Sequence, residues 1–441
     1  MSASPTSSSS PSPALSPVAA GVLSDLDASP SPYHAVARSV ELLEAAGFAS
    51  VDPGAPLPDG PGRRYVVFGG SIVAWAQPER LERFVVAGAH TDSPNFRVRT
   101  RPDVNSAGYV QVGVEVYGGV LLNSWLDRDL GLAGRVAVTG DNGIEHRLYR
   151  EHRPVLRIPQ LAIHLDREIR SKGLLLDPQS HITPMWALGE GTEGDLRAAV
   201  ATDLGVEPDA ILSWDLMTYD VQPAAVVGRD EDLFASGRID NLVSAFCGVR
   251  ALNDAAELMG AADTTTAPVL VLSDHEEVGS ESATGAAGPL LSQLLERIAA
   301  SAGLARTDYL ATLPTSLVVS ADGAHATHPN YAERHEPSHR IALNAGVVIK
   351  RNANQRYATD ATSEALVVDA ARRADVPLQY YIHRNDLPCG STIGPITAAR
   401  LGVPTVDLGV AQLAMHSARE MAGLADLDHL HALLRTLWTA R

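Results

Sequence analysis

Cysteine is nearly absent from this chain of 441 residues, which has only Cys247 and Cys389. Two thiols are too few for a disulfide framework, and they are also too few for a zinc site built from thiolates. Long apolar runs are missing as well, because no stretch approaches the roughly 18 residues that a membrane helix needs. The sequence therefore argues against a disulfide-rich secreted protein and against a membrane-spanning one.

Basic charge is also scarce. Lys and Arg number 35 against 52 Asp and Glu, which gives a formal net charge of −17. Such a surface repels nucleic-acid phosphates and anionic lipid, so neither a nucleic acid nor a membrane is expected as a partner. Residues 1–18 are rich in Ser and Pro but lack the basic start and the apolar core of a secretory signal. We expect a disordered tail over residues 1–17 and a cytoplasmic protein.

The rest of the chain has the composition of a globular protein, since 45% of its residues are hydrophobic. At roughly 150 residues per domain, its length predicts two or three domains. Residues 18–97 and 233–441 alternate strand-like and helix-like segments, which predicts an α/β domain. Residues 98–232 differ, because valines alternate with other residues over 110–116 as in a half-buried antiparallel strand. We therefore predict a β-rich domain inserted into the α/β domain.

Hydrophobic periodicity and turn residues predict the individual elements. Helices are expected at residues 33–46, 241–251, 290–300, 363–374, 418–422 and 427–439. In the α/β part, strands are expected at 65–68, 71–76, 84–90, 269–272, 316–320, 378–382 and 405–408. In the inserted part, the Gly-Asp-Asn-Gly segment at 140–143 predicts a hairpin between strands at 135–139 and 144–149.

The most distinctive segment follows the apolar run 269–272, where the chain continues as Asp-His-Glu-Glu-Val-Gly over residues 274–279. In an open α/β sheet, ligands bind beyond the carboxyl ends of the strands. Adjacent carboxylates at such an edge resist ionising together unless a cation is present. A metal bound by one glutamate, with the other free to move protons, would explain the Glu276–Glu277 pair. A surface turn with two solvated glutamates is the alternative, which the pair alone does not exclude.

Other potential metal ligands have comparable positions. His90 and Asp322 follow apolar strand-like runs, and His416 lies a few residues after another such run. Asp240 stands at the start of a predicted helix. Each also has a purely structural alternative: His90 as a core histidine, Asp240 as a helix N-cap, Asp322 as a turn residue and His416 as a helix-end residue. Their joint placement favours a metal site, and mixed histidine and carboxylate ligation suits zinc, manganese or cobalt.

This inventory fits a site for two divalent metal ions, which needs one bridging carboxylate and terminal His and carboxylate ligands. Two such ions lower the pKa of a bridging water and polarise a scissile carbonyl. A carboxylate that binds no metal then takes the proton from the water and passes it to the leaving amine. Asp92, two residues after His90, can orient that imidazole.

Several motifs resemble those of the aspartyl aminopeptidases, which are dinuclear zinc metallopeptidases of the zinc-exopeptidase fold. The resemblance runs from residue 29 to residue 421, and so many blocks in one order are a specific signal. It implies a zinc-exopeptidase-type α/β/α catalytic domain with a mostly-β inserted dimerisation domain. The blocks are residues 89–94 (AHTDSP), 238–241 (RIDN), 274–280 (DHEEVGS), 320–325 (SADGAH), 348–350 (VIK), 355–358 (QRYA), 384–390 (RNDLPCG) and 412–417 (QLAMHS).

The resemblance implies a division of the metal ligands between two ions. Asp240 would bridge the ions. His90 and Asp322 would complete the shell of one ion, and Glu277 and His416 would complete the shell of the other.

The resemblance also implies roles outside the metal shell. Glu276 would be the general base, and Asp92 would stand behind His90. His164, in the inserted block, is similar to a family histidine that reaches the active site of a neighbouring subunit, although a core histidine is its structural alternative. His325 matches a family position near the substrate. The family assembly would be a homododecamer of tetrahedral shape.

Lys350 ends the apolar run 347–349 and is the expected specificity residue. The family favours peptides with an N-terminal Asp or Glu, whose side-chain carboxylate needs a positive partner in a protein of this net charge. A buried ammonium is costly unless it is paired, and the substrate would supply the pair. A lysine that extends to the surface is the alternative.

The sequence thus predicts a metal-dependent aminopeptidase that releases N-terminal Asp and Glu by attack of a metal-bridged hydroxide, with the ions stabilising the oxyanion. Three alternatives stay open. The first is a same-fold aminopeptidase with neutral or leucine-type preference, and the second is a different dinuclear amidohydrolase such as a deacylase. The third is a non-catalytic binding protein that keeps the fold, and the intact ligand set argues against it.

Overall fold

The computed structural model describes residues 15–141, 143–259 and 264–439. Within these residues the strands form three sheets, of nine, six and five strands. The predicted tail lies outside the described residues except for its last three positions, and helix α1 (Pro17–Ala28) begins at the third of these. Asn142 of the predicted hairpin turn also lies outside the described residues.

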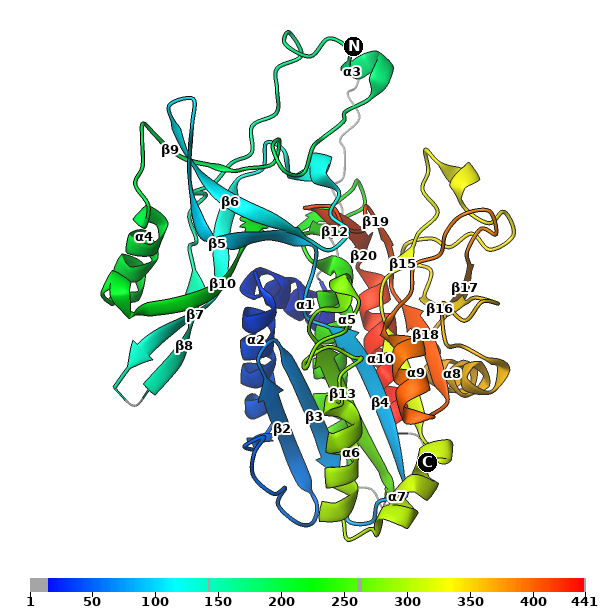
Figure 1. The fold of residues 1–441 in the computed structure, drawn as a ribbon. Helices are drawn as coiled ribbons and strands as arrows, with labels where there is room; N and C mark the ends of the chain where they lie inside the picture. The colour runs from blue at the N-terminus through cyan, green and yellow to red at the C-terminus, as the bar shows by residue number, and fades with distance from the viewer. Residues whose placement is uncertain (1–14, 142, 260–263, 440–441) are drawn as a thin grey trace, which may run out of the picture.

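The nine-stranded sheet forms the centre of the α/β part (Figure 1). Its inner strands are rich in Val, Leu and Ala and are buried along almost their whole length, as expected for parallel strands covered on both faces. In spatial order its strands are β1 (Ala49–Ser50), β2 (Gly62–Phe68), β3 (Ser71–Gln77), β13 (Thr266–Ser273), β4 (Arg83–His90), β14 (Leu317–Ala321), β18 (Thr405–Gly409), β16 (Val347–Arg351) and β17 (Leu378–Ile382).

Helices cover both faces of this sheet, and two separate apolar cores fill the space between. This α/β/α layering confirms the predicted fold class. The first core includes residues of α1, α2 (Pro32–Ala45), α5 (Ile239–Met259), α8 (Ala361–Ala374) and α10 (Ala425–Thr439). The second includes residues of α6 (Leu290–Ser301), α7 (Arg306–Thr312) and the segment at the end of α9 (Ile393–Leu401).

The six-stranded sheet is entirely antiparallel and has its own apolar core, to which α4 (Asp195–Leu204) contributes Leu196 and Val200. It lies above the nine-stranded sheet in Figure 1. Its strands are, in order, β8 (Gly143–Arg150), β7 (Leu130–Gly140), β10 (Ile211–Asp220), β5 (Asn95–Ser106), β6 (Tyr109–Tyr117) and β9 (Met185–Leu188). The same stretch of chain includes η1 (Leu122–Trp125), α3 (Ile169–Lys172) and η2 (Pro208–Ala210).

The five-stranded sheet lies where the two larger sheets meet (Figure 1). It combines strands from distant parts of the chain, and the loop between its strands β19 and β20 carries His416. Its order is β11 (Ala225–Val227), β12 (Leu233–Ser236), β20 (Glu420–Gly423), β19 (Ala411–Leu413) and β15 (Ala324–His325). The remaining short turns are η3 (Glu276–Val278), η4 (Leu313–Thr315) and η5 (Ala332–Arg334).

Most predicted elements agree with the structure to within a few residues, but the helix predicted at 418–422 is wrong. Residues 420–422 of that segment belong to β20, which pairs with β12 and β19. Five residues are too few for periodicity to distinguish a helix from a strand, and here the neighbouring strands decide. The sequence did not predict helices α1, α3, α4, α7 and α9.

Two expectations from composition concern the described residues directly. None of the helices found there combines the length and the apolar character needed to cross a bilayer. Cys247 is buried, Cys389 is partly exposed, and both are free thiols.

Candidate metal centre

Three neighbouring strands bring predicted ligands to one edge of the nine-stranded sheet. β4 lies between β13 and β14 and runs parallel to both, so the carboxyl ends of all three strands meet. His90 is the last residue of β4, and Asp322 directly follows β14. Glu276 and Glu277 begin η3, three residues after β13 ends. This arrangement follows from the buried parallel strands, which leave room for polar side chains only at their ends.

Asp240 and His416 reach the same edge from other elements. Asp240 is at the start of α5, and its two carboxylate oxygens face two imidazoles. Oδ1 lies 3.3 Å from His90 Nε2, and Oδ2 lies 3.6 Å from His416 Nε2. Asp240 therefore stands between the two histidines, which is the position that a bridging ligand requires.

The other two carboxylates complete the groups around each imidazole. Asp322 Oδ1 is 3.7 Å from His90 Nε2, and Glu277 Oε2 is 3.4 Å from His416 Nε2. One potential ligand atom from each of His90, Asp240 and Glu277 also lies within 4.8 Å of the other two. The five residues thus form two overlapping clusters that share Asp240.

The donor set fits a bound cation. Asp240 Oδ1 and Glu277 Oε1 are buried, and within the described part of the chain neither accepts a hydrogen bond. Buried carboxylate oxygens are normally satisfied, so these two atoms call for a positive partner. The zinc expected from the sequence would meet this need, because both carboxylates and neutral imidazoles are its ordinary ligands.

The pKa values show the same competition for positive charge. Burial lowers the pKa of His90, but the nearby carboxylates of Asp240, Asp322 and Asp92 outweigh this effect and hold that pKa well above its ordinary value. Burial and the charge of Asp240 together raise the pKa of Glu277 well above its ordinary value. The raised pKa values keep protons on the cluster. A divalent cation bound there would neutralise the carboxylates instead, and its binding would release these protons.

Glu276 and Glu277 are adjacent in sequence but differ in environment. The side chain of Glu277 is 4% exposed and contacts His416, whereas that of Glu276 is 16% exposed and lies 4.0 Å from His90 Nε2 at its closest. Burial raises the pKa of Glu276 to about 7. A more accessible carboxyl with a pKa near neutrality matches the requirements of a general base.

Asp92 is buried behind the cluster, but its contact with His90 differs from the expected one. His90 Nδ1 forms its 2.9 Å hydrogen bond with the backbone carbonyl of Asp92, and the carboxylate is 3.5 Å away. The carboxylate instead accepts hydrogen bonds from the backbone N–H groups of Glu276 and Glu277, each at 3.1 Å. Asp92 therefore orients the imidazole through its main chain and the glutamate pair through its side chain.

A pocket of about 350 Å³ opens beside these groups, and Lys350 lines it. Lys350 is 2% exposed, so the alternative of a lysine extending to the surface is wrong. Its Nζ donates a hydrogen bond to the carbonyl of Gly323 at 3.0 Å and lies 3.4 Å from Asp322 Oδ2. It also lies 5.2 Å from the ring centre of Tyr357.

The two other predicted substrate-binding residues have different positions. His325 lines the pocket, where desolvation and the charge of Lys350 lower its pKa to about 4. His164 is exposed in a turn of the six-stranded part and does not line the pocket of its own chain. The alternative of a core histidine at 164 is therefore wrong.

Sequence reasoning missed Glu420, which links the segments that carry Asp240 and His416. Its carboxylate accepts hydrogen bonds from the backbone N–H of Asp240 at 3.0 Å and from that of His416 at 2.8 Å. Burial raises the pKa of this carboxyl to about 8. A glutamate in a short strand gives no distinctive signal in the sequence, so only the fold identifies it.

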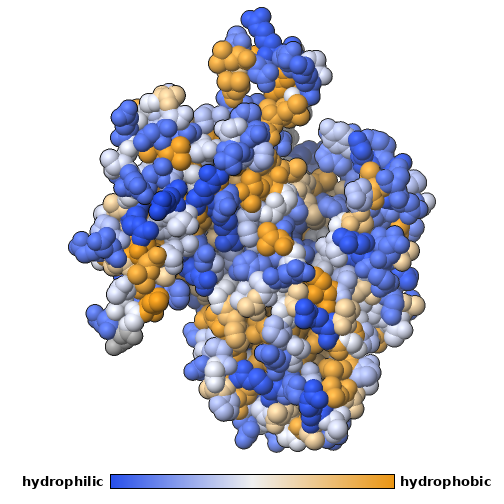
Figure 2. Space-filling model, in the orientation of Figure 1, coloured by the Kyte–Doolittle hydropathy of each residue, from blue (hydrophilic) through white to orange (hydrophobic). Residues whose placement is uncertain are grey.

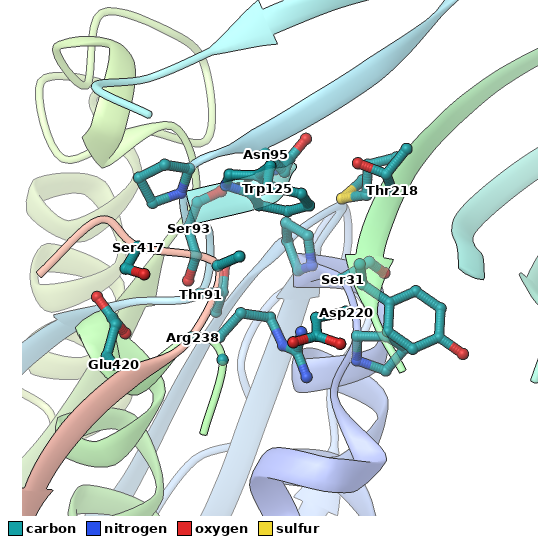
Figure 3. Close-up of a pocket in the computed structure, with 17 residues that line it drawn as sticks. Ser31, Thr91, Ser93, Asn95, Trp125, Thr218, Asp220, Arg238, Ser417 and Glu420 are labelled. Carbon is teal, nitrogen blue, oxygen red and sulfur yellow. Dashed lines mark hydrogen bonds between the residues drawn. The ribbon is translucent and has the colours of Figure 1, made fainter. Parts of the chain in front are cut away.

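A second, much smaller cavity adjoins the metal centre, since Thr91 and Glu420 line it. Figure 3 shows these residues together with Ser93, Asp220 and Arg238. Its volume of about 20 Å³ is room for roughly one water molecule, so it cannot accept a peptide. The larger pocket is the one that fits a substrate.

Comparison with known proteins places the chain in a family. The family model described as aminopeptidase I zinc metalloprotease (M18) matches residues 26–438. A probable M18 family aminopeptidase 2 of Streptomyces coelicolor is 49% identical over 411 residues, which is 92% of this chain and 94% of that protein.

Solved structures agree with this match. A chain in the cryo-EM structure of the Ape4 and Nbr1 complex is similar, with a TM-score of 0.91 and 36% identity over 96% of this chain and 85% of that chain. The S. cerevisiae mApe1 dodecamer is also similar, with a TM-score of 0.85 and 26% identity over 96% of this chain and 97% of that chain.

These matches confirm, at the level of the family, the resemblance that the sequence motifs indicated. They also confirm the expectation of a metal-dependent enzyme that cleaves peptide bonds. The chain belongs to the M18 family of zinc metalloproteases and is a metallo-aminopeptidase.

Proposed function

We propose that this enzyme releases N-terminal Asp and Glu residues from peptides and uses two zinc ions to do so. The observation that carries the proposal is the buried Lys350, which lies in the same pocket as the metal-ligand cluster. The five residues proposed to hold the ions are His90, Asp240, Glu277, Asp322 and His416, with Asp240 as the shared ligand.

Bound by these residues, zinc would supply a Lewis acid for the scissile carbonyl and for a water molecule. The protein supplies the proton transfer. Glu276, with its raised pKa and its more accessible carboxyl, takes the proton from the attacking water and passes it to the leaving amine. Asp92 holds the Glu276 and Glu277 main chain in place, so that one carboxyl faces the ligand cluster while the other stays free.

Lys350 gives the acidic preference its physical basis. Among the described residues that line the pocket, it is the only lysine or arginine, and several carboxylates surround it. A substrate with an acidic side chain would meet strong repulsion there without this ammonium group. If Asp322 held a metal ion, Lys350 would be left to pair with the side-chain carboxylate of the substrate.

The six-stranded part, predicted as residues 98–232, is proposed to be a dimerisation domain within a larger assembly. The similarity to a dodecameric structure supports self-association, and a tetrahedral homododecamer is the proposed form. Leu161, Leu165 and Leu175 are exposed on the projecting loop around α3, where Figure 2 shows apolar surface. His164 lies on the same loop, so assembly would place it against a neighbouring subunit.

The test is a kinetic comparison of the zinc-loaded enzyme on Asp-, Glu- and Leu-derived aminoacyl substrates. We expect kcat/KM for Asp and Glu to exceed that for Leu by about 100-fold, because one buried charge pair is at stake. A higher value for Leu would contradict the acidic preference while leaving the family assignment intact. N-acetylated amino acids in the same assay test the deacylase alternative, and we expect no turnover of them. A cytoplasmic location remains part of the proposal.

A further inference from the structure

The six-stranded sheet reaches the metal centre through the end of β6 and the residues that follow. Tyr117 is the last residue of β6, and its hydroxyl donates a 2.7 Å hydrogen bond to Asp92 Oδ2. Asp92 is fully buried and holds the backbone of Glu276 and Glu277. Tyr117 therefore fixes the carboxylate on which both glutamates depend.

Two residues later the same segment contacts the other histidine directly. The carbonyl of Gly119 lies 3.0 Å from His416 Nδ1. Because a carbonyl can only accept a hydrogen bond, this contact places the ring proton on Nδ1 and leaves Nε2 free to face Asp240 and Glu277. The hydrogen bond between His90 Nδ1 and a backbone carbonyl has the same consequence for the first imidazole.

The fit between this segment and the ligands is close. A Cβ added to Gly118 would lie 3.0 Å from Glu277 Cβ, and one added to Gly119 would lie 3.0 Å from His416 Nδ1. Gly118 also has a φ of +75°, which disfavours a side chain. No larger residue fits here without displacing a ligand.

Further hydrogen bonds hold the loop that carries His416 to the same segment. The backbone N–H of Leu121 donates to the carbonyl of His416 at 3.1 Å, and Ser124 Oγ accepts from the backbone N–H of Ala418 at 2.9 Å. The segment 117–124 thus contacts the loop at His416 and again at Ala418.

We propose that residues 117–124 of the inserted part are a positioning element for the glutamate pair and His416 of the metal centre, so that zinc affinity depends on how the six-stranded sheet docks against the α/β part. The proposal rests on the two-zinc centre proposed above. Residues that orient metal ligands from outside typically contribute 10- to 100-fold to metal affinity. Tyr117 and Gly119 are positioning residues, since neither contacts the metal or the substrate in this scheme.

The experiment measures zinc affinity of the full-length protein by competition with a chromophoric chelator, without any peptide. Tyr117→Phe removes the hydroxyl but keeps the ring, over which the Arg97 guanidinium stacks at 4.1 Å. Gly119→Ala crowds His416 at a position where the backbone itself accepts alanine. We expect each variant to bind zinc about 10-fold more weakly and to show an altered absorption spectrum with cobalt.

Matched controls come from the same sheet. Tyr149→Phe also removes a hydroxyl that donates to a carboxylate, that of Asp203 at 2.9 Å. Asp203 is neither a proposed metal ligand nor adjacent to one in the sequence. Gly113→Ala introduces a Cβ whose nearest neighbours are the Arg99 side chain and backbone atoms of Pro102, at 3.3 Å or more. We expect both controls to bind zinc within about twofold of the wild type. Thermal unfolding of the metal-free proteins checks that Tyr117→Phe and Tyr149→Phe are equally well folded.

Two results would overturn the proposal: wild-type zinc affinity in both Tyr117→Phe and Gly119→Ala, or an equal loss in Tyr149→Phe. A wild type that binds no zinc would overturn it together with the two-zinc centre. A failure of the acidic preference alone would leave the zinc measurements unchanged, so the two failures are distinguishable.

Discussion

The nine-stranded and six-stranded sheets differ in how much of their strands is buried. All eight residues of β13 are buried, whereas only one of the eight residues of β8 is. A sheet covered by helices on both faces has no place for polar side chains along its strands, while an antiparallel sheet with one open face does. In the first sheet, polar groups are therefore concentrated at the strand ends, where His90 and Asp322 lie.

The six-stranded sheet contributes to the same centre in a different form. It offers a hydroxyl from Tyr117 and a backbone carbonyl from Gly119, and its projecting loop exposes apolar side chains. We therefore expect substitutions in the α/β part to abolish catalytic turnover or substrate preference. Substitutions in the inserted part should instead change metal affinity and assembly.

The largest effect is expected for Asp240→Ala in the α/β part. Loss of the carboxylate that faces both imidazoles should remove bound zinc and lower turnover by at least about 1,000-fold. Elemental analysis and a peptide-release assay check this. The matched substitution Asp203→Ala in the inserted part removes the partner of Tyr149 and should leave both quantities unchanged. Equal losses of zinc and turnover in the two variants would contradict the proposed difference between the α/β part and the inserted part.

The next effect concerns substrate specificity. The chain has only two lysines, so the same substitution at the second one serves as the control. Lys350→Met should lower kcat/KM for Asp and Glu substrates about 100-fold more than for Leu, since the substrate carboxylate loses its buried partner. Lys172→Met, in α3 of the inserted part, breaks an exposed pair with Glu168 outside the pocket and should leave the ratio of the acidic to the neutral kcat/KM unchanged. Equal loss for acidic and neutral substrates in Lys350→Met would remove its specificity role.

The smallest effect is expected on the projecting loop. Leu165→Asp should shift the assembly to smaller species in light scattering, because it places a charge on an apolar surface that is 76% exposed in the single chain at this residue. His164→Ala should leave the assembly intact and lower turnover by about 10-fold. An unchanged assembly in Leu165→Asp would mean that this loop is not an interface.

The parts of the site that could be predicted from the sequence share one property. An apolar run that ends in a histidine or a carboxylate is visible in the sequence, and His90, Asp322 and the glutamate pair all follow such runs. The structure brings these residues together with Asp240 and His416, although their roles as ligands stay predictions.

The contributions of Tyr117 and Gly119 could not be predicted. A tyrosine at the end of an alternating strand is ordinary in any sheet, and every residue has a backbone carbonyl. Only the docking of the two sheets brings this hydroxyl and this carbonyl to Asp92 and His416. The error at 418–422 has a similar origin, because pairing with distant strands outweighed the local pattern.

The central claim is that the ligand cluster holds two zinc ions while Glu276 stays free to transfer protons. The most direct test measures bound zinc and turnover together in the wild type and in Glu276→Gln. We predict two zinc ions per chain in both proteins and a loss of turnover of about 100- to 10,000-fold in the variant. Zinc lost from Glu276→Gln would make Glu276 a ligand, and turnover retained with both ions bound would remove it as the base; either result would contradict the account.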